Sequence, residues 1–209
     1  MTQSEILKRG LYKLGIDFSD IQIRLLELYI SEIELWNSKL KLVSSKGEQL
    51  IIRHILDSLS SFTELQKYRF KTAADVGSGA GFPGIPLSLF FPDVEFYLIE
   101  RSGRRVGFLR NVISLMNLGE RVKIIESGLD DVSDRYDLVL FRAFRNIIDF
   151  YDDLKKITSS GGIMFAYKGK MENIQSELDH LGDKIKVEIS SVTVPFLEEE
   201  RNFCIFFLK

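Results

Sequence analysis

The sequence contains a single cysteine, Cys204, among its 209 residues. One thiol can form neither an internal disulfide nor a multi-cysteine metal site, and this fits a protein of the reducing cytoplasm. No apolar run is long enough to cross a bilayer, and residues 1–10 lack the apolar stretch of a secretory signal. We therefore expect a cytoplasmic protein that binds neither a metal nor a membrane, and no feature indicates an obligate protein partner.

An excess of positive charge is also absent. The chain has 28 basic and 30 acidic residues, and its net charge is −2. General nucleic-acid binders are usually basic, so the composition disfavours unspecific binding to RNA. A locally basic surface remains compatible with this balance, because the field at a site depends on where the charges lie. The length allows one or two domains with a sizeable hydrophobic core.

Two hydrophobic patterns divide the chain. Apolar residues recur at helical spacing over residues 21–40, and a second amphipathic segment covers residues 50–65. These segments predict an N-terminal helical subdomain over residues 1–70. From residue 71 onwards short strands alternate with helices, which indicates a parallel sheet covered on both faces.

The second part is therefore expected to be a Rossmann-like α/β domain over residues 71–209. Its predicted strands are 72–76, 94–100, 122–125, 136–141, 162–167, 185–194 and 203–208. Its predicted helices are 84–91, 104–116, 147–157 and 171–181. The last two strands follow each other without a helix, so we expect them to pair antiparallel.

A glycine-rich loop over residues 75–84 leaves the first strand and opens the first helix of this domain. Glycines let the backbone turn tightly and approach a ligand closely. One interpretation is a dinucleotide-binding loop, because Gly79, Gly81 and Gly84 have the G-x-G-x-x-G spacing. The other is a loop for S-adenosyl-L-methionine, because Asp75 alternates with Gly77, Gly79 and Gly81 as in the first motif of methyltransferases. An acid suits the methionine ammonium, which a phosphate-binding loop does not meet, and this favours S-adenosylmethionine.

Residues at the ends of the next two strands suit the rest of this cofactor. Glu100 ends the second strand, and its carboxylate can accept hydrogen bonds from two ribose hydroxyls. An ion pair with Arg101 or Arg104 is the alternative role of Glu100. After the third strand Leu129 can pack on the adenine and Asp130 can lie at its amino edge, although a solvated acidic turn has the same pattern.

Motifs that the sequence lacks exclude several classes of methylation target. Methylation of pyrimidine carbon 5 needs a thiolate, whereas Cys204 lies in an apolar strand. Methylation of exocyclic amines commonly uses an Asn/Asp-Pro-Pro-aromatic motif, which residues 140–144 do not contain. Guanine N7 has a lone pair and no proton, so its methylation needs alignment without a general base. Arg142 can pair with guanine O6 or a phosphate, or it can be an ordinary arginine at a helix entry.

Several runs together resemble the RsmG (GidB) family of bacterial guanine-N7 methyltransferases that act on 16S ribosomal RNA of the small subunit. The most specific are Arg-His-Ile-Leu-Asp-Ser at 53–58 and Phe-Pro-Gly-Ile-Pro at 82–86. The other matching runs are 35–37, 42–44, 75–87, 103–109, 142–144, 167–169 and 200–201. The resemblance covers nearly the whole chain and implies a class I S-adenosylmethionine-dependent methyltransferase fold.

The resemblance also implies roles for single residues. The cofactor positions that the resemblance implies are Gly77, Phe82, Leu129, Asp130 and Arg142, with Glu100 in the ribose place. The loop motif described above adds Asp75, Gly79 and Gly81 to the expected cofactor residues. Arg142 and Arg201 match arginines near the target guanosine and are the expected catalytic residues. Asn37 and His54 match motifs that flank the pocket, with helix packing and capping as their alternative role. Lys41, Arg101 and Phe141 depart from the residues that are frequent in the family.

Local basic clusters fit this resemblance. The basic residues expected to contact RNA, besides Arg201, are Arg104, Arg105 and Lys168. Lys39 and Lys41 belong to a further basic cluster in the helical part. The basic clusters are expected to form a rim on the cofactor side, and the acidic runs 130–131 and 198–200 are expected to lie away from it. Three alternatives stay open at this point: a small-molecule methyltransferase, a nicotinamide-dependent oxidoreductase and a non-catalytic nucleotide-binding scaffold.

Overall fold

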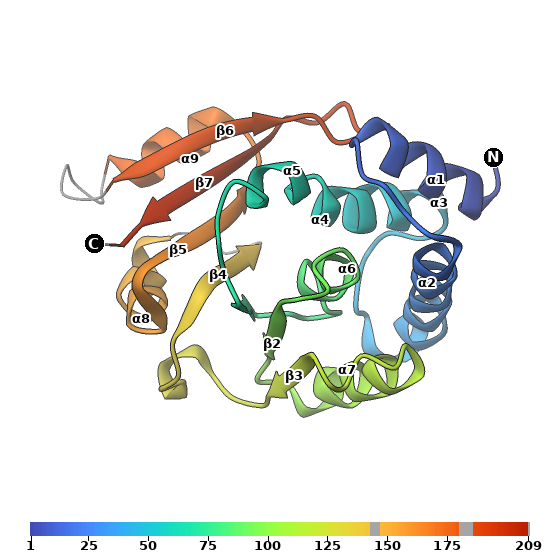
Figure 1. Cartoon of the computed structure of the whole chain (residues 1–209), viewed down its shortest axis with the longest axis horizontal. Helices are drawn as coiled ribbons and strands as arrows, with labels where there is room; N and C mark the ends of the chain where they lie inside the picture. Colours follow the sequence, from blue (N-terminus) through green and yellow to red (C-terminus); the bar gives the residue numbers. More distant parts are fainter. Residues whose placement is uncertain (143–146, 180–185, 209) are drawn as a thin grey trace.

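A seven-stranded sheet with helices on both faces forms the centre of the computed structural model, which describes residues 1–142, 147–179 and 186–208 (Figure 1). The strands are β1 Thr72–Val76, β2 Glu95–Ile99, β3 Val122–Ile125, β4 Tyr136–Arg142, β5 Thr158–Lys168, β6 Val187–Val192 and β7 Arg201–Phe207. Their order is β3-β2-β1-β4-β5-β7-β6. The α/β class is thus confirmed, and the order reverses between β1 and β4, where folds of this kind bind ligands.

The pairing of the strands also agrees with the sequence. Strands β1 to β5 are parallel, whereas β7 runs antiparallel to both β5 and β6. The predicted antiparallel closing pair is therefore confirmed. Parts of three expectations, the matching run 142–144, the helix 171–181 and the strand 185–194, fall at residues 143–144, 180–181 and 185, which lie outside the described residues.

Helices fill the N-terminal part, as predicted. They are α1 Gln3–Lys13, α2 Asp20–Leu40, α3 Glu48–Leu50, the π-helical η1 Ile51–Leu56, α4 Asp57–Leu59 and α5 Phe62–Leu65. Capping boxes at Thr2 and Ser19 fix the starts of α1 and α2, since each side chain accepts a hydrogen bond from the N3 amide. The single amphipathic segment expected over residues 50–65 is divided into four short helical pieces, and its π-helical piece carries His54.

The remaining helices follow the strands in alternation. They are α6 Gly84–Ser88, α7 Gly103–Leu115, η2 Leu129–Asp131, η3 Ile148–Phe150, α8 Tyr151–Lys156 and α9 Met171–Leu178. Helix α6 is shorter than expected, because the amides of Leu89 and Phe90 turn back to carbonyls only three residues before them. The helix expected over residues 147–157 begins with the 3₁₀ turn η3 and continues as α8.

Two hydrophobic cores lie on opposite faces of the sheet. One contains side chains of the N-terminal helices, α6, α7 and one sheet face, and the other contains side chains of α8, α9 and the opposite face. Tyr29 of α2 also donates a hydrogen bond of 2.6 Å to the carbonyl of Ala80 in the glycine loop. The N-terminal helices thus support the loop directly, and the division at residue 70 stays a prediction. None of the helices in the described ranges has the length and apolar character needed to span a membrane.

Candidate active site

The glycine loop lies between the end of β1 and the start of α6. Gly77, Gly79 and Gly81 have φ angles of 70°, 60° and 96°, which side chains with a Cβ rarely adopt. The amide of Gly77 donates to the carbonyl of Ile99 at 2.9 Å and so ties the loop to β2. A Cβ at Gly79 would meet only the Gly77 carbonyl oxygen, at 3.8 Å, so this side of the loop is open to a ligand.

Asp75, at the end of β1, holds the glycine loop in place through a hydrogen bond. Its side chain is fully buried, and Oδ2 accepts a hydrogen bond of 2.9 Å from the amide of Gly84. Oδ1 is buried without a hydrogen-bond partner in the described part of the chain. Burial raises the pKa of Asp75 to about 7, although the Gly84 amide and Arg142 oppose this shift. The carboxylate therefore supports the loop in this structure, and its contact with a methionine ammonium stays a prediction.

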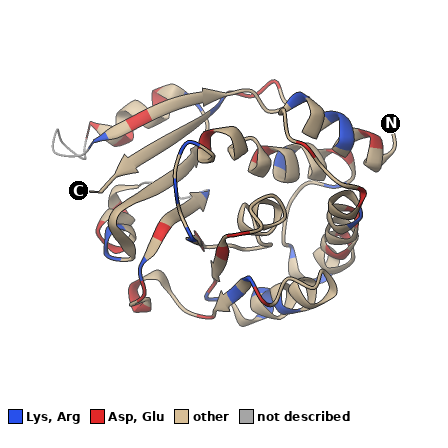
Figure 2. Ribbon diagram, in the orientation of Figure 1, with Lys and Arg blue, Asp and Glu red and all other residues tan. Residues whose placement is uncertain are grey.

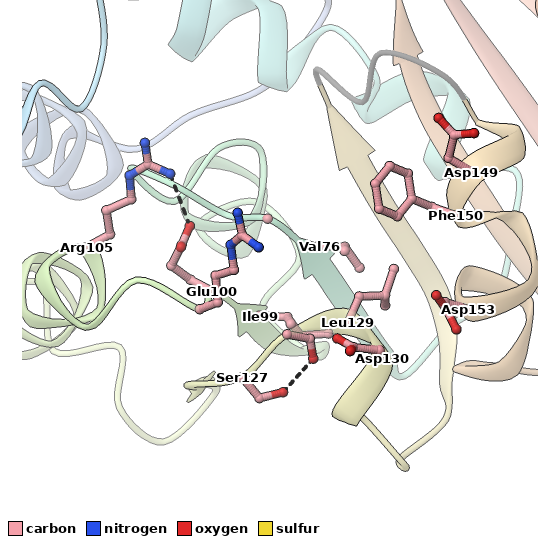
Figure 3. A pocket seen from close by; sticks show the side chains of 13 residues that line it. Val76, Ile99, Glu100, Arg105, Ser127, Leu129, Asp130, Asp149, Phe150 and Asp153 are labelled. Carbon is pink, nitrogen blue, oxygen red and sulfur yellow. Dashed lines mark hydrogen bonds and ion pairs between the residues drawn. The ribbon is translucent and has the colours of Figure 1, made fainter.

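A cavity of about 510 Å³ opens beside the loop at the carboxyl ends of β1, β2 and β3 (Figure 3). Its lining residues are Val76, Gly77, Ile99, Glu100, Arg101, Arg105, Ser127, Gly128, Leu129, Asp130, Asp149, Phe150 and Asp153. Four expected cofactor residues, Gly77, Glu100, Leu129 and Asp130, thus share one cavity. Gly79 joins them through a hydrogen bond to Glu100, whereas Asp75, Gly81, Phe82 and Arg142 are not among its lining residues.

Glu100 is the central acid of this cavity and is only 4% exposed. Oε2 accepts a hydrogen bond of 3.0 Å from the Gly79 amide, and Oε1 accepts one of 2.8 Å from the Ser102 amide. Arg105 lies 3.7 Å from Oε2, too far for a good hydrogen bond (Figure 3). Each oxygen of an ionised carboxylate can accept two hydrogen bonds, so capacity remains on both oxygens for ligand hydroxyls.

Residues of the cavity wall that the sequence did not indicate include Asp149 and Phe150 of η3 and Asp153 of α8. They lie opposite the Glu100 side of the cavity (Figure 3). The rule that ligands bind at the carboxyl ends of parallel strands could have indicated them, because η3 follows β4 in the sequence. Their types gave no signal, since acids and a phenylalanine are ordinary at the start of a helix.

The two arginines expected to be catalytic meet at one buried carboxylate, that of Asp57. Nη1 of Arg142 lies 3.2 Å from Oδ2 of Asp57, and Nε of Arg201 lies 2.9 Å from Oδ1. Asp57 is 5% exposed and begins α4, whereas the arginines end β4 and begin β7. Asp57 was not among the expected site residues, although it lies in the specific run 53–58. Its position beside apolar residues of an amphipathic segment was the available signal.

Acidic residues lie within the basic surface, so the expectation that they lie apart is wrong. Glu199 pairs with Arg201 at 3.1 Å and with Arg53 at 2.5 Å. Asp130 lines the same cavity as Arg101 and Arg105. Cations that are close together are stabilised by carboxylates between them, and a linear sequence pattern does not reveal this arrangement.

Phe82 connects the glycine loop to the arginines. The guanidinium of Arg142 lies 5.2 Å from the centre of the Phe82 ring, and the His54 ring stacks on the same ring at 5.1 Å. Burial, assisted by the cations Arg142 and Arg53, lowers the pKa of His54 to about 3. The imidazole is therefore neutral, and Nδ1 accepts from Arg142 at 3.0 Å. Nε2 then carries the proton, and it is buried without a partner among the described residues.

Other expected residues have separate surroundings. Oδ1 of Asn37 accepts a hydrogen bond of 3.0 Å from the Val43 amide and so closes the turn after α2. Lys168 pairs with Glu177 of α9 at 2.7 Å, whereas Arg142 and Arg201 pair with Asp57. Arg104 and Arg105 lie in the first turn of α7 and line a second cavity, described below. The roles of these four residues in substrate binding stay predictions.

Comparison with solved structures identifies the fold. The chain is similar to a precorrin-6y C5,15-methyltransferase of Geobacter metallireducens, with a TM-score of 0.52, 18% identity and coverage of 81% of this chain and 91% of that chain. It is also similar to the tRNA methyltransferase TrmI of Aquifex aeolicus, with a TM-score of 0.57, 13% identity and coverage of 74% and 69%. At these identities the likeness shows the fold alone, which is that of class I methyltransferases.

The family follows from sequence comparison. The GidB family model, described as rRNA small subunit methyltransferase G, matches residues 22–204, and the chain belongs to this family. Two proteins named ribosomal RNA small subunit methyltransferase G are among its relatives. The one from Borrelia hermsii is 35% identical over 95% of this chain and 96% of its own length. The one from Neisseria meningitidis serogroup B is 31% identical over 98% of both chains. The family expected from the sequence motifs is thus confirmed.

Proposed function

We propose that this chain transfers a methyl group from S-adenosylmethionine to N7 of a guanosine in 16S ribosomal RNA of the small subunit. The observation that carries this proposal is the arrangement of the cavity and the arginines. The glycine loop borders the cavity on one side and, through Phe82, contacts Arg142, which shares Asp57 with Arg201. Membership of a family described as acting on small-subunit rRNA supports RNA over the alternative of a small-molecule substrate.

The cavity fits S-adenosylmethionine, which supplies an electrophilic methyl group when bound. The open side of Gly79 allows close backbone approach, and Glu100 has acceptor capacity for ribose hydroxyls. Leu129 and Phe150 provide apolar surface for an adenine ring, and Asp130 can accept from its amino group. Acids and apolar side chains in these positions suit a nucleoside without phosphates, and three acids, Asp130, Asp149 and Asp153, disfavour the pyrophosphate of a dinucleotide.

The side chains near the proposed reaction point also match an N7 target. Cys204 is buried in β7, and burial raises the pKa of its thiol to about 12, so it is no thiolate nucleophile at neutral pH. The neutral His54 has its acceptor nitrogen occupied by Arg142 and so cannot act as a base in this arrangement. Guanine N7 requires neither a thiolate nor a base, because its lone pair attacks directly once it is aligned.

Arg142 and Arg201 can supply this alignment. Methyl transfer to N7 places positive charge on the purine, so the arginines cannot act by neutralising the ring. Their useful contacts are O6, which is the hydrogen-bond acceptor beside N7, and the phosphates of the RNA. The shared carboxylate of Asp57 restricts both guanidiniums, which lowers the entropy lost when the base is bound.

Radiolabelled S-adenosylmethionine and undermethylated small ribosomal subunits test the proposal. We expect label in 16S RNA with the wild-type protein and strongly reduced label with Arg201→Ala, whose affinity for S-adenosylhomocysteine should stay within a few-fold of wild type. Arg24→Ala is a matched control, because Arg24 is an exposed arginine of α2 outside the cavity and outside the contacts of Asp57. Absence of label from 16S RNA with folded wild-type protein, or equal label with Arg201→Ala and wild type, would refute the proposal.

A further inference from the structure

A second cavity, of about 490 Å³, lies between the end of α2 and the start of α7. Its lining residues are Lys39, Leu40, Lys41, Glu100, Arg101, Ser102, Arg104 and Arg105. Basic residues from two segments that are about sixty positions apart in the sequence therefore meet in one hollow, and the charged ribbon shows those of α7 close to its start (Figure 2). We call this hollow the basic cavity.

The contacts between α2 and α7 hold the walls of the basic cavity in place. The rings of Trp36 and Phe108 meet edge to face with their centres 6.0 Å apart. Oε2 of Glu32 accepts hydrogen bonds from Asn111 at 2.7 Å and from Trp36 at 3.2 Å. The lysines at the end of α2 are thus held beside the arginines at the start of α7 by packing and hydrogen bonds one to two turns away, without a ligand.

The basic cavity carries a large excess of positive charge. It contains five cations and one carboxylate, that of Glu100. Among the residues that the structure describes, a carboxylate lies within 4 Å of Arg105, that of Glu100, and within 4 Å of none of the other four cations. Lys39, Lys41, Arg101 and Arg104 therefore lie near each other without ion pairs in that part of the chain, and each of them is exposed. Unpaired cations at close range repel each other, so an anion bound among them relieves this repulsion.

The position of the basic cavity limits what this anion can be. It shares Glu100, Arg101 and Arg105 with the cavity beside the glycine loop. Its exposed cations come from two elements and offer flexible ammonium groups as well as planar guanidiniums, which suits successive phosphates of an extended chain. A single enclosed anion would need cations that are turned inward and desolvated, and such burial is not found for these four side chains.

We propose that the basic cavity binds the sugar-phosphate backbone of RNA next to the nucleotide held for methylation. This inference rests on the proposed function and deepens it, because it assigns Lys39, Lys41, Arg101 and Arg104 as phosphate contacts. It also explains how a protein of net charge −2 can bind RNA at a defined place. The shared wall residues then place phosphate binding and cofactor binding side by side.

The test compares the salt dependence of binding to undermethylated small subunits. Lys39→Gln/Lys41→Gln removes two proposed phosphate contacts and leaves the glycine-loop cavity intact. Each lost contact lowers the slope of log affinity against log salt by about 0.7–0.9, so the slope should fall by about 1.4–1.8. Between 50 and 200 mM salt the wild type should then lose roughly 7–12 times more affinity than the variant.

Arg135→Gln/Lys155→Gln is the matched control. It removes the same charge from another cavity, beside the start of β5 at the opposite end of the sheet, and both residues are exposed. The control should keep the wild-type slope, and both variants should keep the wild-type melting temperature and affinity for S-adenosylhomocysteine. Equal slope changes in both variants would overturn the inference, because net charge alone would then explain them. Loss of S-adenosylhomocysteine binding in Lys39→Gln/Lys41→Gln with an unchanged salt slope would also overturn it, since the cavity would then serve the cofactor.

The same experiment separates this inference from the proposed function. If the wild type binds small subunits but transfers no methyl group, the proposed function fails, and the comparison of slopes still decides whether the basic cavity binds phosphates. If methyl transfer is observed and the two variants behave alike, the function stands and the phosphate site is refuted.

Discussion

Replacement of Asp57 is the most informative perturbation of the arginine arrangement. Asp57→Ala removes the carboxylate shared by Arg142 and Arg201, whose side chains are 20% and 22% exposed. A charge-assisted hydrogen bond contributes about 1.5–3 kcal/mol, and two are lost. Water can partly solvate both guanidiniums, and Arg201 retains Glu199, so we expect the free energy of unfolding to fall by roughly 2–4 kcal/mol. Asp57→Asn keeps one acceptor oxygen but loses the charge and turns an NH2 donor toward one guanidinium, so it should also lower the free energy of unfolding.

Activity should respond more strongly than stability, because both arginines lose their common support. At a temperature where the variant is folded, Asp57→Ala should reduce methyl transfer to small subunits while affinity for S-adenosylhomocysteine stays within a few-fold of wild type. Chemical denaturation, calorimetry and label incorporation are the three assays. Asp137→Ala is the control, since Asp137 also accepts two hydrogen bonds, from the amides of Lys71 and Thr72, but lies at the other end of β1.

Either of two results would refute this role of Asp57. A stability loss below about 0.5 kcal/mol would mean that the Asp57 contacts behave like exposed surface ion pairs. Equal loss of methyl transfer in Asp57→Ala and Asp137→Ala, after correction for the folded fraction, would mean that the carboxylate has only a general structural role.

Three further predictions concern the glycine loop and the cavity beside it. Glu100→Ala should weaken S-adenosylhomocysteine binding by about 1.5–3 kcal/mol. A calorimetric loss well below about 0.5 kcal/mol would contradict the ribose assignment, because surface ion pairs contribute about 0–1 kcal/mol. Gly79→Val should abolish the rise in melting temperature on adding S-adenosylhomocysteine, because a branched side chain would fill the open side of the loop and oppose its φ of 60°; an unchanged rise in a folded variant would contradict this. In the folded protein the pKa of Asp75 is about 7, against an ordinary value of 3.8. The free energy of unfolding should therefore fall as pH rises from 4 to 7, by up to about 1.4 kcal/mol per pH unit, because only the folded state still binds this proton. In ligand-free protein, Asp75→Asn should remove this dependence of the free energy of unfolding on pH. Denaturation at several pH values that gives the same dependence for wild type and Asp75→Asn would contradict the prediction.

Much of the fold could be predicted from the sequence, because its periodicities are local. The alternating strands of the second part follow from short apolar runs, and strands β1 and β3 have the predicted bounds. The π-helical turn at Ile51–Leu56 could not be predicted, since an amphipathic pattern does not distinguish a regular helix from one widened by a turn. That turn carries His54 toward Phe82 and leads into Asp57, so a local irregularity decides part of the site.

Residues of the candidate site were predicted where they belong to one sequence motif. Residues whose place in the site depends on contacts between distant segments were missed. Gly77, Glu100, Leu129 and Asp130 each follow a strand, and the topology of a parallel sheet brings such residues to one edge. Asp57 and Glu199 contact arginines that are 85 to 146 positions away in the sequence. Nothing in the spacing of residues reveals such ion pairs. The meeting of Lys39 and Lys41 with Arg104 likewise depends on the packing of α2 against α7.

The proposed site aligns a nucleophile that needs no deprotonation, and this alignment predicts which nucleoside is methylated. Undermethylated small subunits treated with the protein and S-adenosylmethionine are digested to nucleosides and analysed by mass spectrometry. We predict 7-methylguanosine as the product with both the wild type and Cys204→Ser, because the buried thiol takes no part. A methylated pyrimidine, a methylated exocyclic amine or a product that disappears in Cys204→Ser would contradict this mechanism.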